Sequence, residues 1–390
     1  MGKSTSRMDC SGAKMRVQIV MSLMPHYRVG LMKALAACDD LDVRVCASRT
    51  VPGIDDLSSE ETGDKYCEDL DHLCTGMMGN RLYWQHKLRL DPDLESGDVL
   101  VVNGNPRFLS NIPLIWSAKS KQVGVVWWSH GFPKPRRLFR DAIRRVFLHF
   151  ADVILLYTDK EVEEFRQLGF PAKKLFATNN AIDEAPIRKA IMAWEGEPLM
   201  DFKDRENIAG KRILLFCGRR TGSVSLELVF NALTRLRKVD GNILFAIIGP
   251  EDNQDDLKRR TVELGVDDCV RWLGPMFEQH DLAPWFLSAS CLVFPGSIGL
   301  SLIHALAYGL PVIVPNCPHG PEIAALRDGE NGLLFRDGDV EDLTRKISSV
   351  IEHPEYHQKL SDEALRTVES DYNMENMAQR YREAMYAAIA

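Results

Sequence analysis

The stretch Cys291–Pro315 reads C-L-V-F-P-G-S-I-G-L-S-L-I-H-A-L-A-Y-G-L-P-V-I-V-P, and it decides the fold of the second half of the chain. Its apolar start, Cys291–Phe294, has the length of a buried strand and ends at a proline. Helix-forming residues fill Leu300–Tyr308, and a glycine and a proline end that run. The β-branched residues of Val312–Val314 predict a second strand. We therefore expect a strand–loop–helix–strand unit of a parallel sheet.

The loop between this strand and its helix has the composition of an anion site. Gly296 and Gly299 allow the backbone N–H groups of the loop to approach a ligand closely. The positive end of the helix dipole points at the same loop, which favours a phosphate or a carboxylate there. Many α/β proteins contain such a unit without using it, so the local pattern leaves a purely structural interpretation open.

Length and composition bound the rest of the chain. With 390 residues the chain is too long for a single ordinary hydrophobic core, so two domains are expected. A content of 45% hydrophobic and 26% charged residues is that of a globular protein, and the net charge of -7 argues against general nucleic-acid binding. Nine cysteines lie at irregular spacings without a CxxC pair, which indicates a reducing, cytoplasmic compartment.

Neither a metal site nor a membrane span is predicted. The pair Cys67 and Cys74 has no flanking His or Cys at zinc-ligand spacing. No apolar run reaches the roughly 18 residues that a spanning helix needs. Residues Met1–Lys14 are polar and lack an apolar core, so we expect a disordered leader there.

The first half opens with a strand, a helix and a second strand, predicted at Arg16–Ser22, Val29–Cys38 and Leu41–Ala47. No GxGxxG follows the first strand, so a dinucleotide cofactor is not expected. Tyr27 and Arg28 follow that strand, at the edge where ligands bind in such sheets. An equally good interpretation is that these two residues only begin the helix.

Two later strands carry polar groups to the same predicted edge. The run D-V-L-V-V-N-G-N-P-R, which starts at Asp98, ends in a loop that contains Asn105. The strand Val123–Trp128 ends in S-H-G-F, where His130 is the titratable group. This histidine is suited to donate a hydrogen bond to a sugar hydroxyl or phosphate, or to transfer a proton. A satisfied turn residue is the alternative.

A basic amphipathic helix is predicted between Lys134 and Phe150, a segment with six basic residues and one acidic residue. Its apolar residues fall near one side at helical spacing and its arginines along the other. The apolar set is Leu138, Phe139, Ile143, Val146, Phe147 and Phe150. On a chain of net charge -7, this pattern indicates contact with anionic lipid or with an anionic acceptor. A solvated helix face is the alternative.

The second half begins after residues 185–210, where hydrophobic periodicity fades and an interdomain linker is expected. The strand Lys211–Cys217 then delivers Gly218, Arg219 and Arg220. Guanidinium groups match phosphate oxygens, so these arginines are a candidate diphosphate clamp. Further on, Glu322 either complements the start of a helix or accepts hydrogen bonds from ligand hydroxyls, and the pattern leaves both open.

The ordered motifs resemble the glycosyltransferases of family 4, also called group 1. The resemblance covers nearly everything from Met15 to Ala390. It rests on P-H-Y-R, W-W-S-H-G-F, N-N-A-I-D, G-R-R, F-P-G-S-I-G-L-S-L-I-H-A-L-A-Y-G-L-P-V-I and G-P-E-I-A-A-L-R-D-G-E-N-G-L-L-F.

This resemblance implies the α/β GT-B fold, with two Rossmann-like domains whose parallel sheets face across a cleft. An acceptor domain would occupy 15–184 and a nucleotide-sugar domain 211–372, with a final helix at 373–390 that crosses back. The family also implies retention of anomeric configuration, no metal and no cofactor, since the nucleotide-sugar is the donor substrate. Its members commonly build polysaccharides, glycolipids or glycosides.

Residue roles follow from the resemblance by position. Arg219, with Arg220, would hold the diphosphate beside Gly218, and His130 would face the reacting sugar. Glu322 would contact the ribose or the sugar. The loop and helix start would supply the backbone cradle, and the first domain would contribute further substrate contacts. The backbone cradle would consist of Ser297, Gly299, Leu300 and Ser301. The contacts from the first domain would come from Tyr27, Arg28 and Asn105.

Three positions depart from the family pattern. Val224 stands where most members have a basic residue, and Gly296 and His304 stand where they have two glutamates. His304 would replace the glutamate that contacts the ribose.

We expect an active transferase that takes a sugar from a UDP- or GDP-sugar to a sugar, lipid-linked or small-molecule acceptor. It is expected in the cytoplasm, with peripheral contact at the inner face of the membrane as an open alternative. The departures motivate a second hypothesis, a catalytically weak nucleotide-sugar-binding partner subunit. A nucleotide-sugar epimerase on the same two-domain plan is the third.

Overall fold

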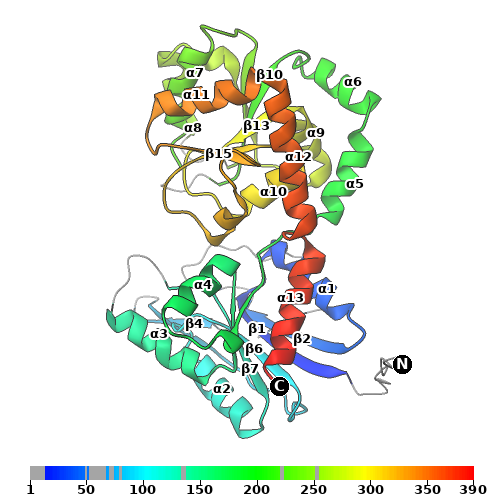
Figure 1. Ribbon diagram of the computed structural model, residues 1–390, viewed down its shortest axis with the longest axis vertical. Coiled ribbons are helices and arrows are strands. Elements are labelled where there is room, and N and C mark those ends of the chain that lie inside the picture. The colour runs from blue at the N-terminus through cyan, green and yellow to red at the C-terminus, as the bar shows by residue number, and fades with distance from the viewer. Residues whose placement is uncertain are drawn as a thin grey trace, which may run out of the picture. The chain divides into compact units, whose positions relative to one another are not determined.

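The computed structural model describes residues 14–48, 51, 67–69, 74–78, 81–132, 138–219, 224–250 and 254–390. The chain divides into two units, coloured along the sequence in Figure 1. The N-terminal unit contains the residues up to Thr178 and also Ala378–Ala390, and the C-terminal unit contains Asn179–Met377.

The N-terminal unit is built on a parallel sheet of seven strands in the order β3-β2-β1-β6-β7-β8-β9. Its central strands are buried along their length, as continuous apolar runs predict for a sheet covered on both faces. Their bounds are β1 (Met15–Leu23), β2 (Leu41–Ser48), β3 (Cys67–Asp69), β6 (Val99–Asn103), β7 (Gly124–Trp128), β8 (Val153–Leu156) and β9 (Leu175–Ala177). A separate antiparallel pair joins β4 (Cys74–Met77) and β5 (Leu82–Gln85).

The strand order places helices on both faces of this sheet. The crossover from β1 to β2 runs in one direction, and those from β6 through β9 run in the other. Figure 1 accordingly shows α2 and α3 next to each other on the side away from α1. The helices are η1 (His26–Arg28), α1 (Val29–Ala36), α2 (Asn111–Ser120), α3 (Leu138–Phe150), α4 (Asp159–Gln167) and η3 (Ala172–Lys174).

The C-terminal unit has six parallel strands in the order β12-β11-β10-β13-β14-β15. The strand–loop–helix–strand prediction is confirmed, because β13 (Ala289–Val293), α10 (Ser301–Ala307) and β14 (Val312–Pro315) follow in that order. The other strands are β10 (Arg212–Cys217), β11 (Ile243–Ile248), β12 (Val270–Gly274) and β15 (Gly332–Phe335). The other helices are α7 (Leu226–Leu236), α8 (Gln254–Glu263), η4 (Asp267–Cys269), α9 (Gln279–Ser288), η5 (Pro321–Ala325), α11 (Val340–Ile351) and α12 (Pro354–Ser370).

Residues 185–210, expected as a linker, fold instead as α5 (Ala185–Trp194) and α6 (Glu197–Arg205) of the C-terminal unit. Ile187 and Phe202 belong to that unit's buried core, and the Phe202 ring lies 5.2 Å from that of Trp285. The prolines in this segment occupy first turns of helices, where proline is tolerated, and do not mark a linker. The last helix, α13 (Met374–Ala387), begins in the C-terminal unit and continues in the N-terminal one. Within the described part of the chain, no helix is long and apolar enough to cross a membrane.

Candidate functional site

Neighbouring strands of the C-terminal unit end at the same edge and bring the predicted motifs together. Gly218, which follows β10, lies against the start of α10, because a Cβ atom there would come within 2.9 Å of the Phe294 ring and 3.1 Å of Ser301 Oγ. This close approach, with a φ of 151°, requires glycine. Arg219 follows with an exposed side chain, and Arg220 lies outside the described residues. Val224 is half-buried against the core.

Backbone amides gather where the glycine loop enters α10. The N–H of Leu302 donates to the Gly299 carbonyl at 3.0 Å. The amides of Gly299, Leu300 and Ser301 have no hydrogen-bond acceptor among the described residues. Three amides at one turn are the arrangement that binds anion oxygens in proteins.

His319 fixes the shape of this glycine loop. Its Nε2–H donates to the Pro315 carbonyl at 2.7 Å, and its Nδ1 accepts from the Ile298 amide at 3.1 Å. Burial lowers the pKa of His319, which favours the neutral ring that this pair of bonds requires. Sequence reasoning missed His319, although its place between two prolines in N-C-P-H-G-P was a signal of a built turn.

The Glu322 carboxylate is buried against the same loop. Its Oε1 accepts a 2.6 Å hydrogen bond from the side-chain amide of Asn180. Its Oε2 faces the glycines, since Cβ atoms added to Gly320 and Gly299 would lie 2.7 Å and 3.9 Å from it. The loop glycines therefore leave room for this carboxylate. Sequence reasoning singled out N-N-A-I-D without assigning Asn180 a role.

His304 lies on α10 and bonds to Gln279, the first residue of α9. Its Nε2 is 2.9 Å from Gln279 Oε1, and the Tyr308 hydroxyl donates to the same oxygen at 3.0 Å. The His304 ring also packs 4.7 Å from Phe286. Burial lowers the pKa of His304 to about 4, so the neutral ring donates its Nε2 proton to the amide oxygen. This contact with α9 engages Nε2 of His304 as a donor, and the contact with a ribose stays a prediction.

In the N-terminal unit the predicted residues Tyr27 and Arg28 meet a cluster of aromatic rings. The Arg28 guanidinium lies 4.8 Å from the Trp128 ring centre, 5.3 Å from that of Tyr157 and 5.2 Å from that of Tyr27. Arg28 is buried, whereas Tyr27 is half-buried. Arginine over aromatic faces is held by cation–π attraction as well as by packing.

His130 joins this cluster through Tyr157, on which its ring stacks at 4.0 Å. Desolvation of the ring, Arg28 and Arg144 together lower the pKa of His130 to about 4. His130 remains exposed to solvent, and the neighbouring cations Arg28 and Arg144 disfavour a charged ring there. The ring is therefore neutral at pH 7, with one donor and one acceptor nitrogen.

Glu161, at the start of α4, holds the loop that carries His130. Its carboxylate accepts from the amides of Gly131 at 2.7 Å, Tyr157 at 2.9 Å and Thr158 at 3.2 Å. Burial raises the pKa of Glu161, and these three bonds oppose that rise. The signal in the sequence was the capping box from Thr158 to Glu161, which sequence reasoning did not use.

Asn105 shapes the neighbouring loop after β6. Its side-chain oxygen accepts from the Arg107 amide at 3.1 Å, which is the geometry of a turn residue. The adjacent Gly104 packs against the loop after β7, where a Cβ would come within 2.3 Å of Ser129. The loops of Asn105 and His130 are therefore neighbours.

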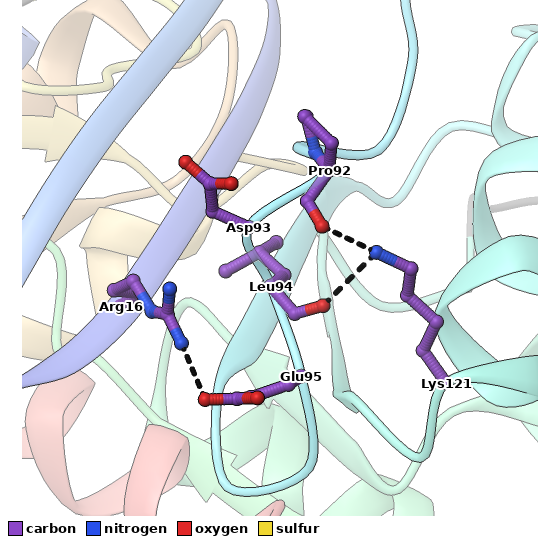
Figure 2. A pocket seen from close by; sticks show the side chains of 6 residues that line it. All are labelled: Arg16, Pro92, Asp93, Leu94, Glu95 and Lys121. Atoms are coloured by element: carbon purple, nitrogen blue, oxygen red, sulfur yellow. Dashed lines mark hydrogen bonds and ion pairs between the residues drawn. The ribbon is translucent and has the colours of Figure 1, made fainter.

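A surface pocket of about 490 Å³ lies at the opposite, amino ends of β1 and β6. Figure 2 shows that Lys121 and Arg16 are engaged by the pocket's own wall, whereas no dashed line reaches the Asp93 carboxylate. Lys121 Nζ donates to the Pro92 and Leu94 carbonyls at 2.6 and 3.2 Å, and Arg16 pairs with Glu95 at 2.7 Å. The two cationic groups of this pocket are therefore already engaged within its wall. No cluster of three or more His, Cys, Asp or Glu suited to a metal occurs among the residues that the structure describes.

Sequence comparison with known proteins finds mainly glycosyltransferases. Residues 200–367 match the family model described as "Glycosyl transferases group 1". An uncharacterized glycosyltransferase of Haemophilus influenzae is 25% identical over 303 residues, which are 76% of this chain and 78% of that protein. Other curated glycosyltransferases are matched over 36% to 50% of their own length.

Solved structures share the fold over nearly the whole chain. A glycosyltransferase of Rickettsia africae has a TM-score of 0.72 at 12% identity, covering 96% of this chain and 98% of that one. Anabaena HepE in complex with UDP has a TM-score of 0.67 at 14% identity, covering 95% and 98%. The fold is therefore the expected α/β GT-B fold. The sequence matches support a glycosyltransferase, and membership of family 4 in particular stays a prediction.

Proposed function

We propose that this protein is a retaining glycosyltransferase that moves a sugar from a UDP- or GDP-sugar to an acceptor hydroxyl, without a metal or a cofactor. The observation that carries the proposal is the buried Glu322 carboxylate facing the glycine loop, beside the strand end that bears Arg219. Glu322 and Arg219 both lie within the segment that matches the family model. Anabaena HepE, which shares the fold, is a protein that binds UDP and UDP-glucose.

The donor diphosphate would be held by Arg219 and by the amides of Gly299, Leu300 and Ser301. Negative charge grows on the diphosphate as the bond to the sugar breaks, so fixed donors stabilise the transition state more than the ground state. A guanidinium stays charged at every working pH and presents a planar fork to phosphate oxygens. Because α10 has only seven residues, the local amides matter more here than a long helix dipole.

Glu322 would accept hydrogen bonds from hydroxyl groups of the donor. Family members place a glutamate at the position of Gly296, and here a carboxylate reaches the same loop from η5. We infer that the Glu322 carboxylate contacts the ribose or the sugar of the donor. A hydrogen bond to a charged acceptor contributes about 1.5–3 kcal/mol, so this contact matters for donor affinity.

The acceptor would bind in the N-terminal unit near His130 and Arg28. A neutral imidazole whose pKa lies near 4 is a weak base at pH 7, which favours a hydrogen-bonding role over proton abstraction. The positive charge of Arg28 on this side would favour an anionic acceptor, such as a lipid-linked or phosphorylated sugar. Such acceptors fit a role in polysaccharide, glycolipid or glycoside synthesis in the cytoplasm.

The test is incubation of the purified chain with UDP- and GDP-sugars, alone and with candidate acceptors. Release of UDP or GDP shows turnover, and the anomeric proton coupling in the product reports retention. A chain that binds these donors without transfer or hydrolysis above background would be the partner subunit of the second hypothesis. A changed sugar on the nucleotide, formed without acceptor, would indicate an epimerase.

A further inference from the structure

The outward face of α3 is apolar. Ile143, Val146 and Phe150 are spaced three and four residues apart, so they form one stripe. Their side chains are 40%, 59% and 53% exposed, whereas Asp141 and Leu148 on the opposite face are buried. Three of the six apolar residues predicted for one side thus form a stripe that points away from the core. Phe147 instead packs 5.4 Å from the Trp127 ring, and the side chains of Leu138 and Phe139 lie outside the described ones.

The helix α2, on the same face of the sheet, also has exposed apolar residues. Ile112 and Trp116 lie one turn apart on α2 and are 50% and 77% exposed. The helices α2 and α3 are successive crossovers on one face of the sheet, and Figure 1 shows them side by side. We name the set the α2–α3 patch; it consists of Ile112, Trp116, Ile143, Val146 and Phe150.

The patch has a basic border. Exposed polar residues of α3 are Arg140, Arg145 and His149, and its acidic residue, Asp141, is buried. The helix α2 has no acidic residue, and Lys119 in its last turn is paired with Asp152 at 2.5 Å, so the basic border comes mainly from α3. The exposed Arg145 guanidinium lies 5.2 Å from the Phe170 ring centre and donates to the Leu168 carbonyl at 3.4 Å. The charge of the surface around the patch is therefore positive, whereas the net charge of the whole chain is -7.

We propose that the α2–α3 patch docks the protein on the surface of an anionic lipid bilayer. Exposed Trp and Phe suit the headgroup region, and Arg residues beside them attract anionic lipid. A second copy of the chain fits less well, because a twofold interface would set the two basic borders against each other. The docking does not depend on the sugar or the nucleotide of the proposed reaction.

The test is flotation of the full chain with phosphatidylcholine vesicles, with and without about one third phosphatidylglycerol. The wild-type chain floats with the anionic vesicles and is released by high salt. The variant Val146→Glu/Phe150→Glu requires at least about tenfold more anionic lipid for half-maximal binding. Val262→Glu, at a residue of the C-terminal unit that is 63% exposed, is the control and binds like wild type.

Three outcomes would overturn the proposal. These are no binding to anionic vesicles, binding that the double variant does not change, and a wild-type dimer in sedimentation that the double variant converts to a monomer. Both substituted side chains are exposed, so the variant is expected to fold, and its unfolding temperature checks this. Glycosyl transfer to a water-soluble acceptor by the double variant separates failure of docking from failure of the proposed reaction.

Discussion

Asn180 and Glu322 are joined by a 2.6 Å side-chain hydrogen bond across 142 residues of sequence. Both residues are buried. The preceding Asn179 adopts a positive φ of 46° and donates to Asp371 at 2.7 Å. The segment where the chain enters the C-terminal unit is therefore tied to the carboxylate that faces the glycine loop.

Replacement of Asn180 by Ala should weaken donor binding. The Glu322 carboxylate would lose a charge-assisted bond in a buried place, which costs about 1.5–3 kcal/mol or roughly 10- to 150-fold in affinity. The measurement is the Kd of the best donor by calorimetry. Asn231→Ala, which removes a surface bond to the Glu227 carbonyl, is the control with little expected effect. Equal Kd values for the two variants would show that Asn180 does not position Glu322.

Replacement of Arg219 by Ala should lower kcat/KM by about 10- to 150-fold, because one charge-assisted contact to the leaving diphosphate is lost. Arg219→Lys should recover only part, since an ammonium lacks the planar fork. Steady-state nucleotide release measures both. The exposed Arg259 of α8 provides the control Arg259→Ala. Unchanged turnover in Arg219→Ala would remove Arg219 from the donor site.

Replacement of Glu161 by Gln should impair the acceptor side alone. In the wild type, backbone amides donate to both oxygens of the Glu161 carboxylate. Glutamine has only one acceptor oxygen and turns N–H groups towards some of these donors, so the loop of His130 should shift. KM for the acceptor should rise about tenfold while the donor Kd stays constant. Combined with His130→Ala, the losses should be less than additive. Glu163→Gln, on the exposed side of α4, is the control, and fully additive losses would contradict the coupling.

Stability should fall in acid in a way that depends on His304. Its pKa drops from 6.5 to about 4 on folding, so the unfolded chain binds the proton more tightly than the native one. Above pH 6.5 His304 is neutral in both the folded and the unfolded chain, and the free energy of unfolding does not depend on it. As the pH falls towards 4, protonation of the unfolded chain lowers the free energy of unfolding by about 2–3 kcal/mol. Urea unfolding of wild type and His304→Gln at pH 7 and 4.5 measures the difference. Equal pH dependence in both proteins would show that His304 is not the group responsible.

The local sequence pattern predicted individual helices and strands better than it predicted which of them pack together. The run Cys291–Pro315 contains its own strand, glycine loop and helix end, so short-range propensity was enough to place them. The same reasoning gave 185–210 as a linker because charges and prolines interrupt its pattern. Whether Ile187 and Phe202 are covered depends on Trp285 and the rest of α9, which are distant in sequence.

The candidate site shows the same division. Arg219 and the glycine loop are recognisable from residue type and position, because strand ends of a parallel sheet share one edge. Asn180 and Glu161 were not found, since Asn180 acts through a bond to Glu322 and Glu161 holds the His130 loop through a bond to Gly131, and only the fold brings these partners near.

The sequence by itself determined the α/β class, the two parallel sheets and the strand ends that carry the site, because these follow from apolar periodicity and glycine placement within short segments. Only the tertiary structure decided which oxygen of Glu322 is bonded to Asn180, that His304 bonds to Gln279, and that the apolar stripe of α3 faces outward. Those outcomes depend on directional contacts and burial between distant segments, and helical periodicity gives the spacing of a face but not the side on which the core lies.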